Sequence, residues 1–163
     1  MSSILIIAYG NPLRSDDGLA WRAADSLEAQ LPASKADIRR VHQLAPELAE
    51  SIGRSEAVIF LDASTSASPE SKSGDIHVEK ILPKDKDPKG TSAFCHAFSS
   101  DGVLALAGQL YGSRADAYSV TMIGENFSHG ESLSPGVAAC LPKMIERVQT
   151  LVQQLLSEGS PTS

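Results

Sequence analysis

Apolar runs alternate with segments of helical periodicity along this 163-residue chain, and that alternation restricts the folds open to it. Residues 3–9 and 57–62 are almost continuously apolar, as strands buried on both faces are. The other expected strands are residues 37–42, 75–80 and 118–124, and the expected helices are residues 17–31, 46–52, 101–111 and 134–156, before a frayed polar tail at 157–163. Strands that alternate with helices form a largely parallel sheet covered on both sides. We therefore expect an α/β fold, a three-layer sandwich with a twisted, mostly parallel sheet of about five strands.

The composition indicates a single globular domain spanning residues 1–163, with 42% hydrophobic and 21% charged residues. A net charge of −6 without a basic stripe argues against nucleic acid and anionic membranes as partners, and it also favours a monomer. The apolar runs are far shorter than the roughly 20 residues of a membrane-spanning helix. Two distant cysteines, Cys95 and Cys140, exclude a disulfide scaffold and suit a reducing cytoplasm.

Two adjacent carboxylates, Asp16 and Asp17, lie in the loop that follows the first expected strand. Ligands of open α/β sheets bind beyond the carboxyl ends of the strands, so this loop is a candidate site. Local features favour a helix cap, because acidic side chains are stabilising at the start of a helix. A cap needs only one acceptor, however, and the second carboxylate could point into the cleft as a metal ligand or an acid–base group.

Two further candidates follow along the chain. Asp62 ends the second buried strand, where it could cap the next turn or serve as a working acid. His96 lies between aromatic residues before the helix at 101–111, either as a packing histidine or as a metal ligand, and its neighbour Cys95 is expected in the core. Phosphate-binding glycine loops, serine nucleophile elbows and His-Glu-x-x-His helices are absent from the sequence. Two carboxylates and one imidazole would suit a divalent first-row metal.

The loop at residues 10–18, Gly-Asn-Pro-Leu-Arg-Ser-Asp-Asp-Gly, resembles the Gly-Asn-x-Leu-x-x-Asp-Asp/Glu-x-Gly opening of hydrogenase maturation endopeptidases. Three later stretches fit the same family in the same order: residues 58–63 ending in Asp-Ala, His96 before a Leu-rich helix, and Ile123-Gly124 followed by Leu133-Ser134-Pro135. The family commonly has a glycine where this chain has Ala8.

The resemblance implies a cytoplasmic endopeptidase that removes a C-terminal extension from the large-subunit precursor of a [NiFe]-hydrogenase. It implies that nickel is supplied by the substrate, and that Asp17, Asp62 and His96 are both its contacts and the catalytic residues. Asp16 is then expected as the helix N-cap, and Asn11 as a substrate-binding residue.

Two alternatives remain at this point. The chain could be a metal-dependent hydrolase of another substrate, with a resident ion on the same three residues. It could also be a non-catalytic binding or chaperone module for a hydrogenase precursor, with protein contacts through Trp21 or the loop at residues 64–74.

Overall fold

The computed structural model describes residues 3–65, 68–83 and 99–158. Its strands are β1 (Ile4–Tyr9), β2 (Ala36–Val41), β3 (Ala57–Ser64), β4 (Ile76–Ile81) and β5 (Asp116–Ile123). Its helices are the 3-10 turn η1 (Ser15–Gly18), α1 (Leu19–Gln30), α2 (Leu48–Gly53), α3 (Ser100–Tyr111) and α4 (Pro135–Glu158). The strands form one sheet in the order β2-β1-β3-β5-β4, in which only the edge strand β4 is antiparallel to its neighbour. The expected α/β fold with a mostly parallel, five-stranded sheet is confirmed.

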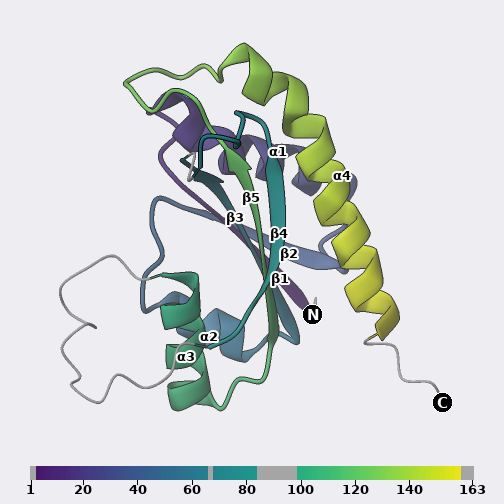
Figure 1. The fold of residues 1–163 in the computed structure, drawn as a ribbon. Coiled ribbons are helices and arrows are strands. Elements are labelled where there is room, and N and C mark those ends of the chain that lie inside the picture. Colours follow the sequence, from purple (N-terminus) through teal and green to yellow (C-terminus); the bar gives the residue numbers. More distant parts are fainter. Residues whose placement is uncertain (1–2, 66–67, 84–98, 159–163) are drawn as a thin grey trace, which may run out of the picture.

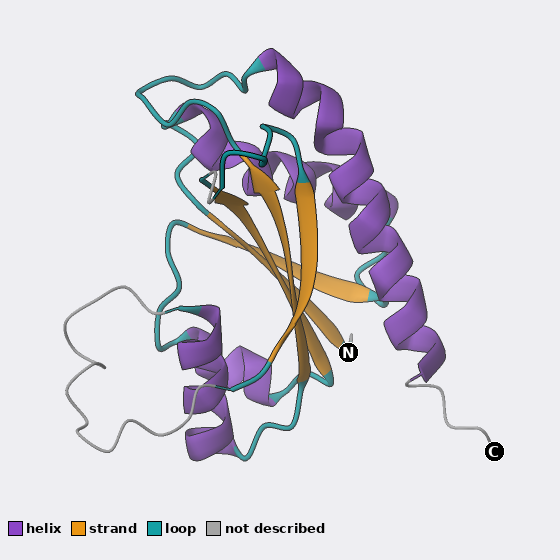
Figure 2. Cartoon of the chain, in the orientation of Figure 1, coloured by secondary structure: helices purple, strands orange, loops and turns teal. Residues whose placement is uncertain are grey.

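Helices cover both faces of the sheet, with α1 and α4 on one side and α2 and α3 on the other (Figures 1 and 2). The alternation of side chains along β1 explains how one strand serves both layers. Ile4, Ile6 and Ala8 pack into the cluster beneath α1 and α4. Leu5 and Ile7 pack into the cluster beneath α2 and α3. A strand of this kind must be apolar at every position, which is the pattern in the sequence.

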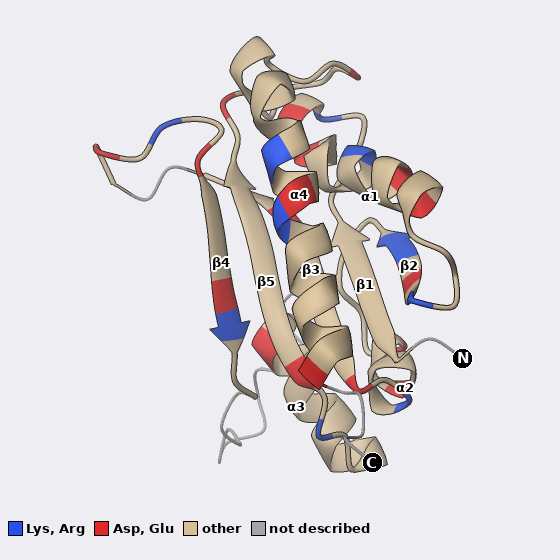
Figure 3. Cartoon of the chain, turned by 90° about the vertical axis from the view of Figure 1, so that its right-hand side faces the viewer, with Lys and Arg blue, Asp and Glu red and all other residues tan. Residues whose placement is uncertain are grey.

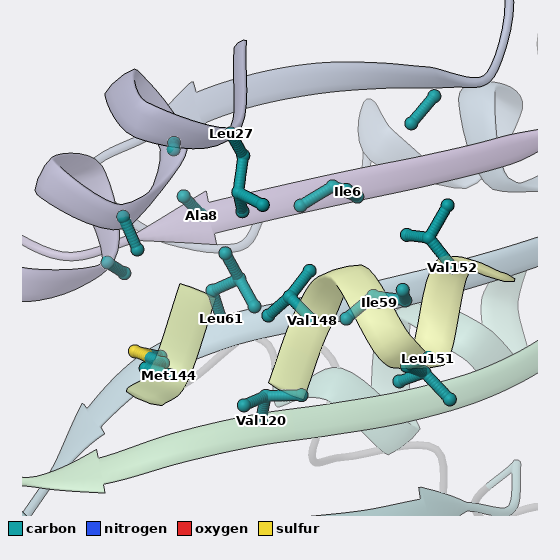
Figure 4. Close-up of a cluster of buried hydrophobic side chains, with 14 of the residues drawn as sticks. Ile6, Ala8, Leu27, Ile59, Leu61, Val120, Met144, Val148, Leu151 and Val152 are labelled. Atoms are coloured by element: carbon teal, nitrogen blue, oxygen red, sulfur yellow. The ribbon is translucent and has the colours of Figure 1, made fainter. Parts of the chain in front are cut away.

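The long helix α4 lies across the sheet between its two edge strands, β4 and β2 (Figure 3). Its buried positions include Met144, Val148 and Val152, which face Ile59 and Val120 of the sheet (Figure 4). This spacing of four residues places one apolar stripe against the sheet, as the sequence predicts.

Two details differ from the expectations. The first helix begins at Leu19 rather than at residue 17, because residues 15–18 form η1 first. The last helix continues through Glu158, so the first two residues of the expected frayed tail are helical, and residues 159–163 lie outside the described part. Leu155, in the last turn of α4, is buried and packs this end of the helix against the core. Within the described residues, no helix has both the length and the apolar composition needed to cross a membrane.

Candidate active site

The loop after β1 folds back so that Asp17 lies over the backbone of Gly10. Gly10 has a φ of +143°, a conformation that L side chains rarely adopt, and a Cβ there would lie 2.1 Å from the carbonyl oxygen of Asp17. The backbone N–H of Asn11 donates a hydrogen bond to Oδ2 of Asp17 at 2.8 Å. A glycine is therefore required at this turn, because it allows the chain to bring the Asp17 carboxylate back to the end of β1.

Asp62 lies on the neighbouring strand β3, at the same edge of the sheet. Ala8 is in register with Leu61, which places Tyr9 beside Asp62. The Ala63 N–H donates to Oδ1 of Asp62 at 2.8 Å, and the Tyr9 hydroxyl also donates to this carboxylate.

Burial raises the pKa of Asp62 to about 7. The hydrogen bonds from Ala63 and Tyr9 act in the opposite direction, and the negative charge of Asp17 raises the pKa further. The two carboxylates are thus close enough to repel each other, and at neutral pH Asp62 exchanges its proton readily.

Tyr9 belongs to this site, although the sequence analysis did not single it out. Burial raises the pKa of Tyr9, and the charge of Asp62 and the hydrogen bond to it raise that pKa further, so the phenol stays protonated as a donor. Its signal in the sequence is an aromatic residue with a polar tip at the carboxyl end of a buried strand. Only the register of β1 against β3 shows which side chain it meets.

Asp16 does not cap the helix that follows it, so that expectation is wrong. The N-cap positions of η1 and α1 are Arg14 and Gly18, and neither makes a side-chain cap hydrogen bond. The Asp16 side chain points instead to the segment between β5 and α4 and is fully buried there. Its carboxylate accepts four hydrogen bonds, from the N–H groups of Glu125, Asn126 and Ser134 and from the Ser134 hydroxyl.

These four donors determine the charge state of Asp16. Burial alone would raise the pKa of this carboxyl group, but the hydrogen bonds from Ser134, Asn126 and Glu125 outweigh burial and lower the pKa below its usual value. Asp16 is therefore a stably ionised residue whose acceptor capacity is occupied by the protein itself.

The other site predictions have mixed outcomes. The structure brings Asp17 and Asp62 together, whereas His96 and Cys95 lie outside the described residues. The Asn11 side-chain oxygen accepts a hydrogen bond from the Leu13 N–H at 2.9 Å, which shapes the loop.

In the part of the chain that the structure describes, no three His, Cys, Asp or Glu side chains form a group that could hold a metal ion. Carboxylate oxygens such as those of Asp17 and Asp62 are suitable ligands for a cation.

Several solved structures with this fold are hydrogenase maturation proteases. The chain matches the hydrogenase maturating endopeptidase HybD from E. coli with a TM-score of 0.70 and 22% identity, over 94% of this chain and 93% of that one. It matches the [NiFe] hydrogenase maturation protease HybD from Thermococcus kodakarensis with a TM-score of 0.68 and 22% identity, over 93% and 99% of the two chains. A hydrogenase 2 maturation peptidase from Thaumarchaeota archaeon SCGC_AB-539-E09 gives a TM-score of 0.71 at 23% identity, over 93% and 99%.

No family model matches the sequence, and no curated protein is similar to it in sequence. The likeness is therefore one of structure, and it extends over nearly the full length of both chains. The chain has the fold of the hydrogenase maturation proteases, with two acidic side chains at the carboxyl edge of its sheet.

Proposed function

We propose that this chain is an endopeptidase that removes a C-terminal extension from the large-subunit precursor of a [NiFe]-hydrogenase, in the cytoplasm, after nickel has been inserted. The observation that carries the proposal is the convergence of Asp17 and Asp62 at the carboxyl edge of a fold shared with hydrogenase maturation proteases. Open α/β sheets bind their ligands at this edge.

In the proposed function, the two carboxylates contact the nickel ion that the precursor carries, and His96 is the third contact. A ligand carboxylate must be ionised, so binding of the loaded precursor would displace the proton that Asp62 holds near neutral pH. The Tyr9 hydroxyl and the Ala63 N–H keep Asp62 oriented during this exchange. A precursor without nickel brings no cation to the two carboxylates, so its complex lacks this stabilising contact.

The cleavage itself consumes one water molecule. Its oxygen adds to the carbonyl carbon of the scissile peptide, the C–N bond breaks, and a new carboxyl group and a free amine are released. An oxygen of Asp62 that does not contact the ion can accept the proton from the attacking water and return it to the leaving amine, which gives Asp62 a second role.

Incubation with nickel-loaded and nickel-free precursor, followed by intact mass, tests this proposal. Loss of a C-terminal peptide from the loaded form alone is the expected result. No mass change in either form would refute the protease and support the binding module. Cleavage of both forms would retain the protease and exclude nickel as the recognition element.

A further inference from the structure

The proposed chemistry uses Asp17 and Asp62 but leaves Asp16 without a part, although the Asp16 side chain is fully buried and accepts four hydrogen bonds. A buried carboxylate is stable only when its acceptor sites are filled, and here all the donors come from one segment, residues 124–134. This segment lies 109 to 118 positions away along the chain. The carboxylate therefore joins two distant loops at the edge of the sheet.

We propose that Asp16 is a positioning residue that fixes Asp17 by anchoring the turn η1 to the segment 124–134. The effect of Asp16 on recognition of the nickel-loaded precursor rests on the proposed function. That Asp16 fixes the position of Asp17 does not depend on that function.

Backbone hydrogen bonds extend the same junction to both sides of the Asp16 carboxylate. The Asp16 N–H donates to the Asn126 carbonyl at 2.9 Å, and the Ser15 N–H donates to the Gly130 carbonyl at 2.7 Å. The Ser15 hydroxyl donates to the Ser128 carbonyl at 2.8 Å. Ser15 and Asp16, the two residues immediately before Asp17, are thus both hydrogen-bonded to the segment 124–134.

The contact between residues 15–16 and the segment 124–134 is closely packed. A Cβ added to Gly124 would lie 2.9 Å from Cβ of Asp16, and one added to Gly130 would lie 2.9 Å from Oγ of Ser15. Ser15 itself has a φ of +53°, an uncommon conformation for a non-glycine residue, which these contacts hold in place.

Asp17 has little other support for its position. Among the described residues, its carboxylate accepts one hydrogen bond, from the Asn11 N–H, while its own N–H donates to the Arg14 carbonyl within the turn. The location of the Asp17 carboxylate therefore follows the location of η1, and that in turn depends on Asp16. Exchange of the Asn11 amide hydrogen reports directly on whether Asp17 is in place.

The test compares Asp16→Asn with Val148→Ala, a core substitution on the buried face of α4 that lowers stability without touching either loop. Asparagine keeps the shape of the side chain but offers an N–H₂ group where one oxygen accepted a hydrogen bond. Under conditions where both variants are folded, we expect exchange of the Asn11 amide to accelerate about tenfold or more in Asp16→Asn only. Equal exchange in the two variants would overturn the proposal.

A second readout addresses the consequence for the substrate. The ratio of the affinities for nickel-loaded and nickel-free precursor should fall about tenfold in Asp16→Asn and stay unchanged in Val148→Ala. An unchanged ratio in Asp16→Asn, with a discriminating wild type, would refute the role in recognition. If the wild-type protein does not discriminate at all, the nickel-recognition part of the proposed function fails, and the Asn11 exchange alone decides the positioning role.

Discussion

Two acidic environments lie at the carboxyl edge of the sheet, one around Asp16 and one around Asp62, and they differ in how many hydrogen bonds the protein donates to the carboxylate. Between the loops 10–18 and 124–134, Asp16 is buried among four donors, and its pKa is lowered. On the neighbouring side, Asp62 is half-buried beside another carboxylate, and its pKa rises to about 7.

The difference shows that burial alone does not define a functional carboxylate. Both groups lose water, but Asp16 recovers its hydrogen bonds from the protein and has no capacity left for a ligand. Asp62 accepts fewer hydrogen bonds from the protein and lies near the negative charge of Asp17. A cation or a proton bound at Asp62 therefore relieves the repulsion between the two carboxylates. The satisfied group holds loops together, and the unsatisfied pair is the candidate for chemistry.

The largest stability effect is expected for Asp16→Ala. This substitution leaves the N–H groups of Glu125, Asn126 and Ser134 without their acceptor, so the free energy of unfolding should fall by roughly 3–5 kcal/mol. Urea denaturation at pH 7 measures the change, with Asp62→Ala, a half-buried carboxylate at the same edge of the sheet, as the comparison. A comparable loss in Asp62→Ala would contradict the distinction between the two environments.

Gly10→Ala should also be costly, because its new Cβ meets the Asp17 carbonyl oxygen, a backbone atom that cannot move aside. A loss of about 3 kcal/mol is expected from this contact together with the positive φ. Gly112 is the control, because it also has a positive φ, of +65°, but has nothing within 4 Å of an added Cβ. Gly112→Ala should cost only about 1 kcal/mol, and equal losses in thermal denaturation would show that the close approach to Asp17 is unimportant.

Asp62→Asn should stabilise the protein at pH 8 and have little effect at pH 4. The folded-state pKa of about 7 lies above the usual value of 3.8, so the folded state holds a proton between these values that the unfolded state has released. Stability from this group is therefore complete at low pH and declines as the pH rises through 7. Removal of the charge should restore on the order of 2 kcal/mol at pH 8. Denaturation curves at the two pH values measure it, and a loss of stability at pH 8 would contradict the raised pKa.

The smallest effect is expected for Ser134→Ala. It removes the hydroxyl that donates to Asp16 at 2.7 Å but keeps the Ser134 N–H, which donates to the other carboxylate oxygen. With three of its four donors retained, Asp16 stays ionised, and the loss should be about 1 kcal/mol. Urea denaturation gives the value, and a loss as large as that of Asp16→Ala would mean that one hydroxyl carries the junction.

The fold was accessible from the sequence because its signals are local. The continuous apolar character of β1 and β3 indicates strands buried on both faces, and the four-residue spacing in α1 and α4 indicates helices that cover them. The positions of Asp17 and Asp62 at strand ends follow from the same patterns.

The role of Asp16 was not accessible, because its partners are more than 100 positions away and include backbone N–H groups, which carry no sequence signal. Adjacent acidic residues before a helix favour a cap by local rules, and the tertiary contact overrides those rules here. The pairing of Tyr9 with Asp62 was hidden for a related reason, since it depends on the register between two strands.

The most direct test of the account is the intact mass of nickel-loaded precursor after incubation with Asp62→Asn, next to the wild-type protein and Val148→Ala. Wild type and Val148→Ala should remove the C-terminal peptide, whereas Asp62→Asn should cleave at least about 100-fold more slowly while being the most stable of the three at pH 8. Cleavage by Asp62→Asn at the wild-type rate would contradict the assignment of this carboxylate to the chemistry.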